Sequence, residues 1–294
     1  MSFITEIQGA VAGAAETVGP SVVGLGRGWG RGSGVVTAAG TVLTNAHVLR
    51  GDEVAVTFAD GRTEHGRVAG SDADLDLAAI SVDTGDAPVV AWEPERLAEL
   101  SIGAPVFALA NPGGRGLRTT FGLVSATGRS FRGPRGRRIG GSVEHTAPLP
   151  RGSSGGPLVD AEHRLLGLNT IRLEGGLILA LPADAAMQRR AEGLATGGAQ
   201  ERPRLGIAIA PARAARRMRA AVGLPERDGL LVRGVEAGSP AANAGLQKGD
   251  LLTAVNQRPL TSVDELFDAL EAAAELKLQV VRGTEEREVA VSLQ

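Results

Sequence analysis

Residues 151–160 read RGSSGGPLVD, in which glycine or serine flanks Ser154 on both sides before the chain becomes apolar. Such a run is typical of a tight backbone turn, because glycine reaches φ angles and close contacts that a Cβ atom would obstruct. A serine at the centre of this turn is either one more small loop residue or an exposed nucleophile. Residues elsewhere in the chain decide between these two interpretations.

The pattern of residues 152–156, GSSGG, fits two hydrolase templates that differ in the order of their catalytic residues. In α/β-hydrolases the acid and the histidine follow the serine, but the only histidine after Ser154 is His163, nine residues on. In the chymotrypsin-like template the order is histidine, acid, serine. TNAHV at residues 44–48 and DADLDLA at residues 72–78 precede Ser154 in that order, so an esterase of the first type is disfavoured.

These motifs resemble those of the HtrA (Deg) family of chymotrypsin-fold serine proteases. In that family the histidine lies in a TNAHV segment, the acid directly precedes an apolar-Ala pair, and the serine lies in GNSGGP. The resemblance implies a triad of His47, Asp76 and Ser154, with Asp74 as the alternative acid. Ser153 stands where the family usually has asparagine, and this departure concerns the shape of the turn.

Each residue of this triad would have a separate chemical task. A serine hydroxyl is a weak nucleophile at neutral pH, so His47 would accept the proton of Ser154 and return it to the leaving amine. Asp76 would hold the imidazole in the useful tautomer and stabilise the imidazolium. The oxyanion hole is expected at Gly152, Ser153 and Ser154, with the N–H groups of Gly152 and Ser154 as its donors.

The expected cleavage preference follows from the residues around this turn. Trypsin-like proteases place an acid six residues before the nucleophile to bind a basic side chain, and that position here is Pro148. The resemblance implies a first specificity pocket with mostly aliphatic walls: Leu149, Thr170, Ile171 and Leu179. We therefore expect cleavage after small or medium apolar residues such as Val, Ala, Leu or Ile. Such residues are mostly buried in folded proteins, which points to unfolded or damaged proteins as substrates and to a role in protein quality control.

The chain reads as a mainly β protein: a double β-barrel protease domain and a second, α+β domain. Short runs rich in Val, Leu and Thr are separated by turn signals such as Asp60-Gly61 and Gly175-Gly176, without βαβ alternation. The predicted parts are an N-terminal helical or extended segment (1–20), a trypsin-like protease domain (21–185), a helix and linker (186–203) and a second domain (204–294). Asp184 is expected to cap the helix, with Ala185, Met187 and Leu194 on its apolar side.

The second domain resembles a PDZ domain of the HtrA type. The resemblance rests on Leu205-Gly206-Ile207, on GSPAANAGLQKGDLLTAVN and on a helix whose start, Ser262 to Glu265, fits a capping box. It implies that a peptide C-terminus adds a strand at Leu205, Gly206 and Ile207. Its side chains would be selected by an apolar groove beside Leu266 and Leu270, two residues of the helical face that also includes Val263 and Phe267.

Composition limits the partners. The 31 basic and 33 acidic residues nearly cancel, so neither nucleic acid nor anionic lipid is expected as a partner, and the five arginines of residues 129–138 are read as a solvated loop. No cofactor and no metal is expected: cysteine is absent and no histidine-carboxylate pair has metal spacing. By resemblance the protein is a homo-oligomer, a trimer, although Phe3 is the only aromatic residue of the N-terminal segment.

The N-terminal segment has neither a signal-peptide pattern nor a membrane-span pattern. A cytoplasmic location is expected if the N-terminus is native, and a periplasmic or extracellular one if a signal was removed. One functional alternative stays open: a proteolytically inactive PDZ scaffold or chaperone whose loops never assemble the oxyanion hole, since fold alone does not establish function.

Overall fold

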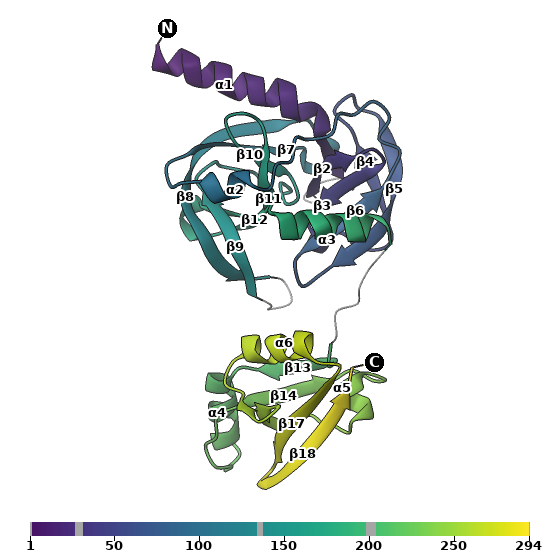
Figure 1. Cartoon of the computed structure of the whole chain (residues 1–294), viewed down its shortest axis with the longest axis vertical. Helices are drawn as coiled ribbons and strands as arrows, with labels where there is room; N and C mark the ends of the chain where they lie inside the picture. Colours follow the sequence, from purple (N-terminus) through teal and green to yellow (C-terminus); the bar gives the residue numbers. More distant parts are fainter. Residues whose placement is uncertain (1, 27–31, 134–137, 198–203, 294) are drawn as a thin grey trace. The chain divides into compact units, whose positions relative to one another are not determined.

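The predicted short strands form two closed barrels and a separate sheet, so the mainly β class is confirmed (Figure 1). The computed structural model describes residues 2–26, 32–133, 138–197 and 204–293. It divides the chain into two units, residues 1–199 and 200–294. The predicted linker includes residues 198–203, and the arginine-rich stretch includes residues 134–137; these residues, and the side chain of Phe3, lie outside the described part.

The two barrels lie in the first unit. The strands of the N-terminal barrel are β1 (Val22–Leu25), β2 (Gly32–Ala38), β3 (Thr41–Thr44), β4 (Glu53–Thr57), β5 (Thr63–Asp72) and β6 (Leu77–Ser81). Those of the C-terminal barrel are β7 (Pro105–Ala110), β8 (Arg118–Arg132), β9 (Arg138–His145), β10 (Pro157–Val159), β11 (Leu165–Arg172) and β12 (Ile178–Pro182).

Both barrels have the same connectivity. Their strand orders are β1-β2-β3-β6-β5-β4 and β7-β8-β9-β12-β11-β10, each closing on its first strand. The predicted turn signals lie at hairpin ends: Gly61, with φ of 87°, joins β4 to β5, and Gly175 and Gly176, with φ of 82° and 86°, join β11 to β12. Closure pairs both edges of each barrel, which leaves the connecting loops to carry polar chemistry.

One apolar cluster joins the two barrels. It contains Leu43 and Leu77 from the first barrel together with Leu109 and Val159 from the second, all nearly fully buried. Separate clusters fill the interior of each barrel. The loops that follow β3, precede β6 and precede β10 are therefore attached to strands that share this central cluster.

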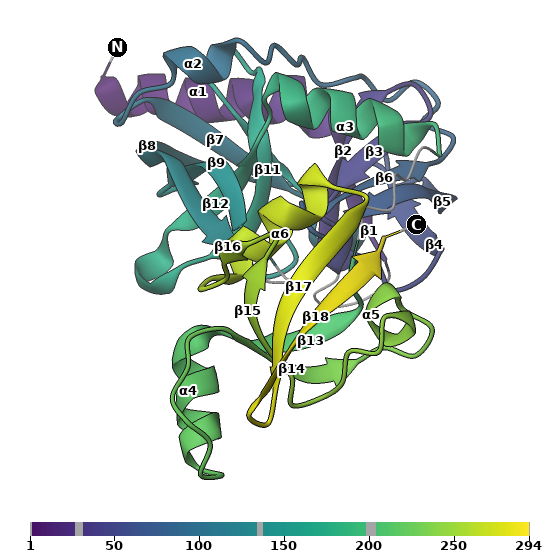
Figure 2. The same cartoon turned by 60° about the horizontal axis from the view of Figure 1, so that its bottom comes forward.

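Helices cover the outside of the barrels (Figure 2). The helical elements of this unit are α1 (Phe3–Val18), α2 (Arg96–Glu99), α3 (Ala185–Ala195) and the 3₁₀ turns η1 (Gly19–Ser21), η2 (Ala46–Val48), η3 (Pro112–Gly114) and η4 (Glu174–Gly176). Helix α1 packs on β7 and β8, and α3 packs on β5 and β6. Within the described ranges, no helix is both long and apolar enough to cross a bilayer.

Helix α3 begins at the predicted cap, because the Asp184 carboxylate accepts a hydrogen bond from the Met187 N–H at 2.8 Å. Its apolar face differs from the prediction. Met187, Ala191 and Leu194 are buried, whereas Ala185 is exposed. The expectation for Ala185 was wrong because positions 187, 191 and 194 follow the spacing of one helical face, whereas position 185 lies two residues from 187 and therefore on the other side of the helix.

The second unit is a sheet in the order β13-β14-β15-β17-β18, with the short β16 beside β15 (Figure 1). Its elements are β13 (Ile207–Ala210), α4 (Ala212–Ala220), β14 (Leu230–Val235), α5 (Pro240–Asn243), β15 (Leu251–Val255), β16 (Arg258–Pro259), α6 (Val263–Ala272), β17 (Glu275–Arg282) and β18 (Glu285–Ser292). The predicted capping box is present at α6, where Ser262 and Glu265 bond each other's backbone N–H groups at 3.3 and 2.9 Å.

Candidate active site

Strand register brings His47 and Asp76 together. Strands β3 and β6 are antiparallel neighbours, with Thr44 opposite Ala78. His47 lies in η2, just after β3, and Asp76 immediately precedes β6, so both residues lie at the same end of this strand pair. The His47 Nδ1 atom is 2.8 and 2.9 Å from the two carboxylate oxygens of Asp76, and the His47 backbone N–H donates to one of them at 3.0 Å.

Asp76 is fully buried and held from several sides. Its φ of 56° is left-handed, a region that aspartate tolerates better than most residues. Its carbonyl oxygen accepts from the Asn45 side chain at 3.0 Å and from the Ala46 N–H at 3.2 Å, and its carboxylate accepts from the Thr170 hydroxyl at 2.8 Å. Because a carboxylate only accepts, Nδ1 of His47 carries a proton, and in the neutral ring Nε2 is the nitrogen with the lone pair.

The turn before Asp76 is built by another aspartate. The Asp72 carboxylate accepts from the N–H groups of Asp74 and Leu75 at 3.1 and 3.0 Å, and from Nε of Arg190 on α3 at 2.8 Å. Asp72 is only 5% exposed and contributes to the fixed position of the turn that carries Asp76. No local pattern indicates this role, because the Arg190 partner lies 118 positions away.

Ser154 lies in the loop between β9 and β10. Its hydroxyl donates to the carbonyl oxygen of Thr170 at 3.2 Å. Among the described residues this is the hydrogen bond that the Ser154 side chain makes, and none joins it to His47. In resting hydrolases the contact between nucleophile and base is often long and shortens only with substrate.

The glycines around Ser154 are required by close backbone contacts. Gly152 and Gly155 have φ of 87° and 86°. A Cβ atom on Gly155 would lie 2.2 Å from the Ser33 carbonyl oxygen, and one on Gly156 would lie 2.2 Å from that of Leu109. Any larger residue at these positions would displace the turn from the strands behind it.

Two residues outside the predicted site support this turn from β9 and β11. The Asn169 side chain is 1% exposed and donates to the carbonyl oxygens of Gly156 and Pro157 at 2.9 and 3.1 Å. Its Oδ1 atom lies 2.9 Å from Nε2 of His145. Burial lowers the pKa of His145 to about 4, although the Asn169 hydrogen bond acts in the opposite direction. His145 is therefore neutral at pH 7 and has a structural role.

The residues predicted for the first specificity pocket have different exposures. Leu149 and Leu179 are 5% and 3% exposed, and Ile171 is partly exposed. Thr170 is 9% exposed and contacts both Asp76 and Ser154, so it belongs to the catalytic neighbourhood. Arg172 is exposed at the end of β11.

In the second unit, the predicted peptide site lies on the edge strand β13 and on α6. Leu205 is 2% exposed, Gly206 has φ of 74°, and Ile207 is partly exposed at the start of β13. Leu266 and Leu270 are 3% and 5% exposed in the core of this unit. The partly exposed apolar side chains of the same helical face are Val263 and Phe267.

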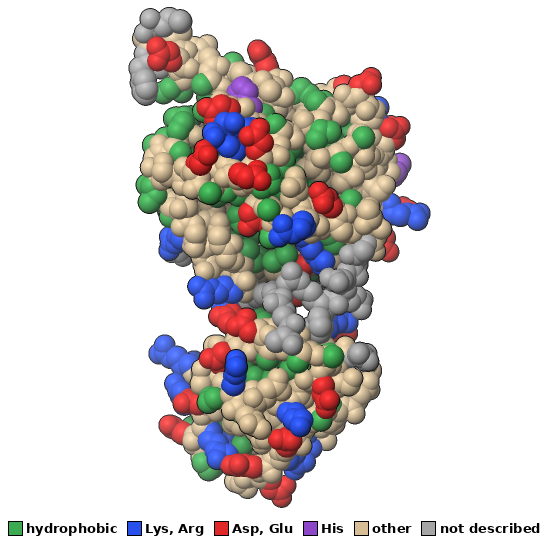
Figure 3. Space-filling view, viewed as in Figure 1, with side chains coloured by type: hydrophobic (Ala, Val, Ile, Leu, Met, Phe, Trp, Pro, Cys, Tyr) green, Lys and Arg blue, Asp and Glu red, His purple; other side chains and the backbone are tan. Residues whose placement is uncertain are grey.

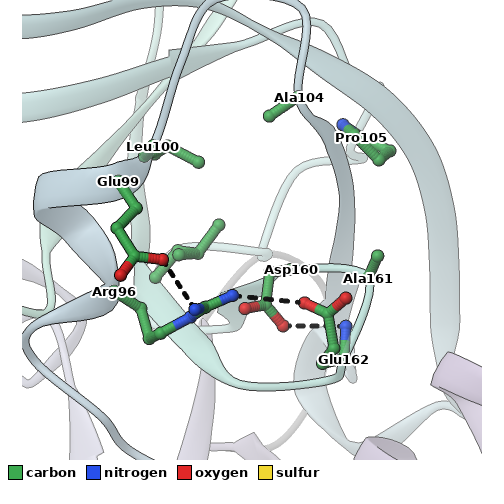
Figure 4. Close-up of a pocket in the computed structure, with 9 residues that line it drawn as sticks. Arg96, Glu99, Leu100, Ala104, Pro105, Asp160, Ala161 and Glu162 are labelled. Carbon is green, nitrogen blue, oxygen red and sulfur yellow. Dashed lines mark hydrogen bonds and ion pairs between the residues drawn. The ribbon is translucent and has the colours of Figure 1, made fainter.

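A cavity of about 270 Å³ lies elsewhere on the C-terminal barrel (Figure 4). It is lined by α2, the start of β7 and the turn after β10, and none of the predicted site residues lines it. Arg96 pairs with Glu99 at 2.6 Å and with Glu162 at 3.7 Å, and Asp160 accepts the backbone N–H of Glu162 at 3.0 Å. The charged groups that line the cavity are thus engaged in ion pairs and hydrogen bonds with one another. On the face drawn in Figure 3, basic and acidic side chains are interspersed in the same way.

Two family profiles match the chain. Residues 32–168 match the trypsin-like peptidase domain, and residues 231–282 match the PDZ domain. The putative serine protease HhoA of Synechocystis sp. is 33% identical over 280 residues, which is 90% of this chain and 70% of the relative. The serine endoprotease DegS of Escherichia coli is 31% identical over 280 residues, which is 90% of this chain and 76% of the relative.

The chain belongs to the HtrA family of serine proteases. As an HtrA protein it is a serine endopeptidase with a C-terminal PDZ domain. A solved structure titled "HtrA-type protease AlgW with decapeptide" matches its fold with a TM-score of 0.69, 24% identity, and coverage of 96% of this chain and 97% of that one. The resemblance recognised in the three motifs is thus confirmed.

Proposed function

We propose that this HtrA protein hydrolyses peptide bonds through a triad of His47, Asp76 and Ser154. The observation that carries the proposal is the double contact of Thr170, whose hydroxyl binds Asp76 while its carbonyl accepts the hydroxyl of Ser154. One residue thus contacts the acid, from the N-terminal barrel, and the nucleophile, from the C-terminal barrel. His47 is bonded to the same carboxylate, and its side chain is 36% exposed, so substrate can reach it.

In this mechanism the Ser154 hydroxyl leaves the carbonyl of Thr170 and donates to Nε2 of His47. The oxygen attacks the substrate carbonyl as His47 takes the proton, and Asp76 stabilises the resulting imidazolium. His47 then protonates the leaving amine, and water hydrolyses the acyl-enzyme by the same route in reverse.

The oxyanion of the tetrahedral intermediate would be bound by the N–H groups of Gly152 and Ser154. Two facts support this assignment. Neither N–H group has an acceptor within the described part of the chain, so both are available to substrate. The positive φ of Gly152 and the glycines at 155 and 156 also allow the tight turn that such a pair of donors needs.

The proposed specificity is cleavage after small or medium aliphatic residues in unfolded or damaged proteins. The proposal rests on Pro148, which occupies the position where an acid would select Lys or Arg, and on the apolar character of Leu149 and Leu179, which are only 5% and 3% exposed. The PDZ unit would bind peptide C-termini along β13. The homo-oligomer expected from resemblance also remains part of the proposal.

Two matched peptides, with Val or Arg at the cleavage position, test the proposal. We expect the Val peptide to be cleaved faster, because an apolar pocket excludes a charged guanidinium. Ser154→Ala should lower kcat by at least about 10⁴-fold, as in other enzymes that lose the nucleophile. Ser81→Ala, which alters an exposed serine of the same unit, is the control.

Faster cleavage of the Arg peptide would overturn the specificity. Undiminished cleavage by Ser154→Ala would overturn the triad. If the wild-type chain cleaves neither peptide nor unfolded casein, the result favours a proteolytically inactive PDZ scaffold or chaperone.

A further inference from the structure

Ser33 is a buried serine of the N-terminal barrel that bonds directly to the turn around the nucleophile. It lies on β2 and is 0% exposed. Its hydroxyl donates to the carbonyl oxygen of Gly152 at 3.0 Å and accepts the backbone N–H of Asn111 at 3.0 Å. Asn111 directly follows β7, and Gly152 lies in the loop before β10, so both belong to the C-terminal barrel. The Ser33 hydroxyl therefore links the two barrels at the candidate active site.

The backbone of Ser33 engages the same turn. Its N–H donates to the carbonyl oxygen of Ser154 at 2.9 Å. Its own carbonyl oxygen accepts the Thr44 hydroxyl at 2.7 Å and lies where a Cβ on Gly155 would have to be. Ser33 is thus fixed by Thr44 and in turn contacts residues 152, 154 and 155.

These contacts bear on the proposed oxyanion donors because each peptide unit is planar. The Ser153 carbonyl accepts the Gly156 N–H at 3.0 Å, which fixes the plane that carries the Ser154 N–H. For the plane that carries the Gly152 N–H, which also holds the Arg151 carbonyl, no such hydrogen bond is present among the described residues. This plane is joined to the next plane through Gly152, whose backbone rotates at low cost. The Ser33 hydroxyl holds the carbonyl of that next plane and so restrains the rotation.

We propose that Ser33 is a positioning residue whose hydroxyl holds the N–H group of Gly152 in the orientation that stabilises the oxyanion together with the Ser154 N–H. The inference rests on the proposed function and adds a residue that the three sequence motifs do not include. Ser33 touches no reacting atom; its hydroxyl acts through the carbonyl group of Gly152, while its backbone N–H, which an alanine keeps, binds the carbonyl of Ser154. Its loss should therefore affect the transition state more than the binding of substrate.

The test compares Ser33→Ala with Ser142→Ala in the full chain. Ser142 is also 0% exposed and donates to a backbone carbonyl, that of Arg129 at 2.9 Å, so its loss has a similar structural cost outside the active site. For Ser33→Ala we expect kcat to fall by about tenfold to a hundredfold, less than or equal to the loss of one oxyanion donor, with KM within about twofold. Ser142→Ala should keep the wild-type kcat.

A peptide boronic acid gives a second readout. Its tetrahedral adduct at Ser154 places an oxygen among the donors, so Ser33→Ala should weaken its inhibition constant by the same factor as kcat. If Ser33→Ala does not fold, Ser33→Cys replaces it, because sulfur keeps the side-chain size but is a weak hydrogen-bond partner. The same losses are expected for that variant.

A kcat and a boronic acid inhibition constant within twofold of wild type, in a folded Ser33 variant, would overturn the positioning role. The role would also be overturned if KM changed by as large a factor as kcat, or if Ser142→Ala lowered kcat as much as Ser33→Ala. Failure of the proposed function would look different. If Ser154 were not the nucleophile, Ser154→Ala would retain activity, whatever the activity of Ser33→Ala.

Discussion

His145 and Asn169 form a buried polar pair behind the turn that carries Ser154. His145 is 0% exposed, and its Nδ1 atom has no hydrogen-bond partner among the described residues. Asn169 donates its amide protons to Gly156 and Pro157, so its Oδ1 accepts the proton on Nε2 of neutral His145. A second proton on His145 would place an unpaired charge in this interior.

This pair predicts acid sensitivity of the first unit. The pKa of His145 is about 4 in the folded chain, below its ordinary value of 6.5. The unfolded state therefore binds a proton that the folded state does not, and stability is lost as pH falls from about 6.5 to about 4. The free energy of unfolding should decrease by about 3 kcal/mol from this residue alone, since one pKa unit corresponds to about 1.4 kcal/mol.

The measurement is urea unfolding at pH 7.5 and pH 4.5, followed by tryptophan fluorescence. Both tryptophans, Trp29 and Trp92, belong to residues 1–199, so the signal reports on the first unit. In His145→Gln, which keeps an amide donor for Asn169, the free energy of unfolding should decrease much less between the two pH values. His65→Gln, at an exposed histidine, should show the same decrease as the wild type. Equal pH dependence in wild type and His145→Gln would refute the assignment.

At this scale, the sequence predicted the residues that have motifs. His47, Asp76 and Ser154 were proposed from local patterns and chain order, and His47 and Asp76 are in contact. Ser33 and Asn169 could not be proposed from one sequence. Each is a small polar residue inside a strand, and the partner of Ser33 lies 119 positions away.

At the scale of elements, β13 is the edge strand of the PDZ sheet. The Glu236 N–H donates to the Gly206 carbonyl at 2.8 Å, and Ile207 is paired with Val235. Because hydrogen-bonded and non-hydrogen-bonded pairs alternate between antiparallel strands, the N–H and carbonyl of Ile207 point to the open edge. An incoming peptide strand would bond there.

Ile207→Pro should therefore weaken peptide binding strongly without unfolding the sheet. Proline removes an N–H that faces the open edge, a position where a sheet tolerates it. The probe is a fluorescein-labelled decapeptide ending in Val with a free carboxylate, and anisotropy measures its affinity for the full chain. We expect at least about a tenfold loss of affinity, because the N–H group that would bond the incoming strand is removed.

Ile207→Val keeps the N–H and the branched side chain and should bind within twofold of wild type. The same peptide with an amidated C-terminus should bind weakly to every variant. Tight binding of the free peptide by a folded Ile207→Pro would contradict strand addition at β13.

Elements were predicted where local chemistry determines them. The α6 capping box and the Asp184 cap of α3 needed only neighbours in sequence, and both are confirmed. The solvent exposure of a helix face depends on what packs against it. For this reason the periodicity of α6 did not indicate that Leu266 and Leu270 are more deeply buried than Val263 and Phe267, whereas Ala185 was assigned to the wrong face of α3 against the helical spacing of Met187, Ala191 and Leu194.

At the scale of the whole molecule, the first unit divides the proposed chemistry between two barrels of the same connectivity. The N-terminal barrel supplies His47 and Asp76, and the C-terminal barrel supplies Ser154. The sequence predicted the double barrel and the order of the three motifs, but it did not assign each motif to a barrel. Contacts between the barrels, such as those of Thr170 with Asp76 and of Ser33 with Gly152, required the folded structure.

The most direct measurement of the central claim is the site and rate of reaction with a fluorophosphonate, followed by intact-mass and peptide-mapping mass spectrometry. One adduct per chain, located on Ser154, is expected for the wild type. His47→Ala should slow its formation by at least about 10³-fold, since a serine without its base is a weak nucleophile. An adduct on another residue, or equally fast labelling of Ser154 without His47, would contradict a triad shared between the two barrels.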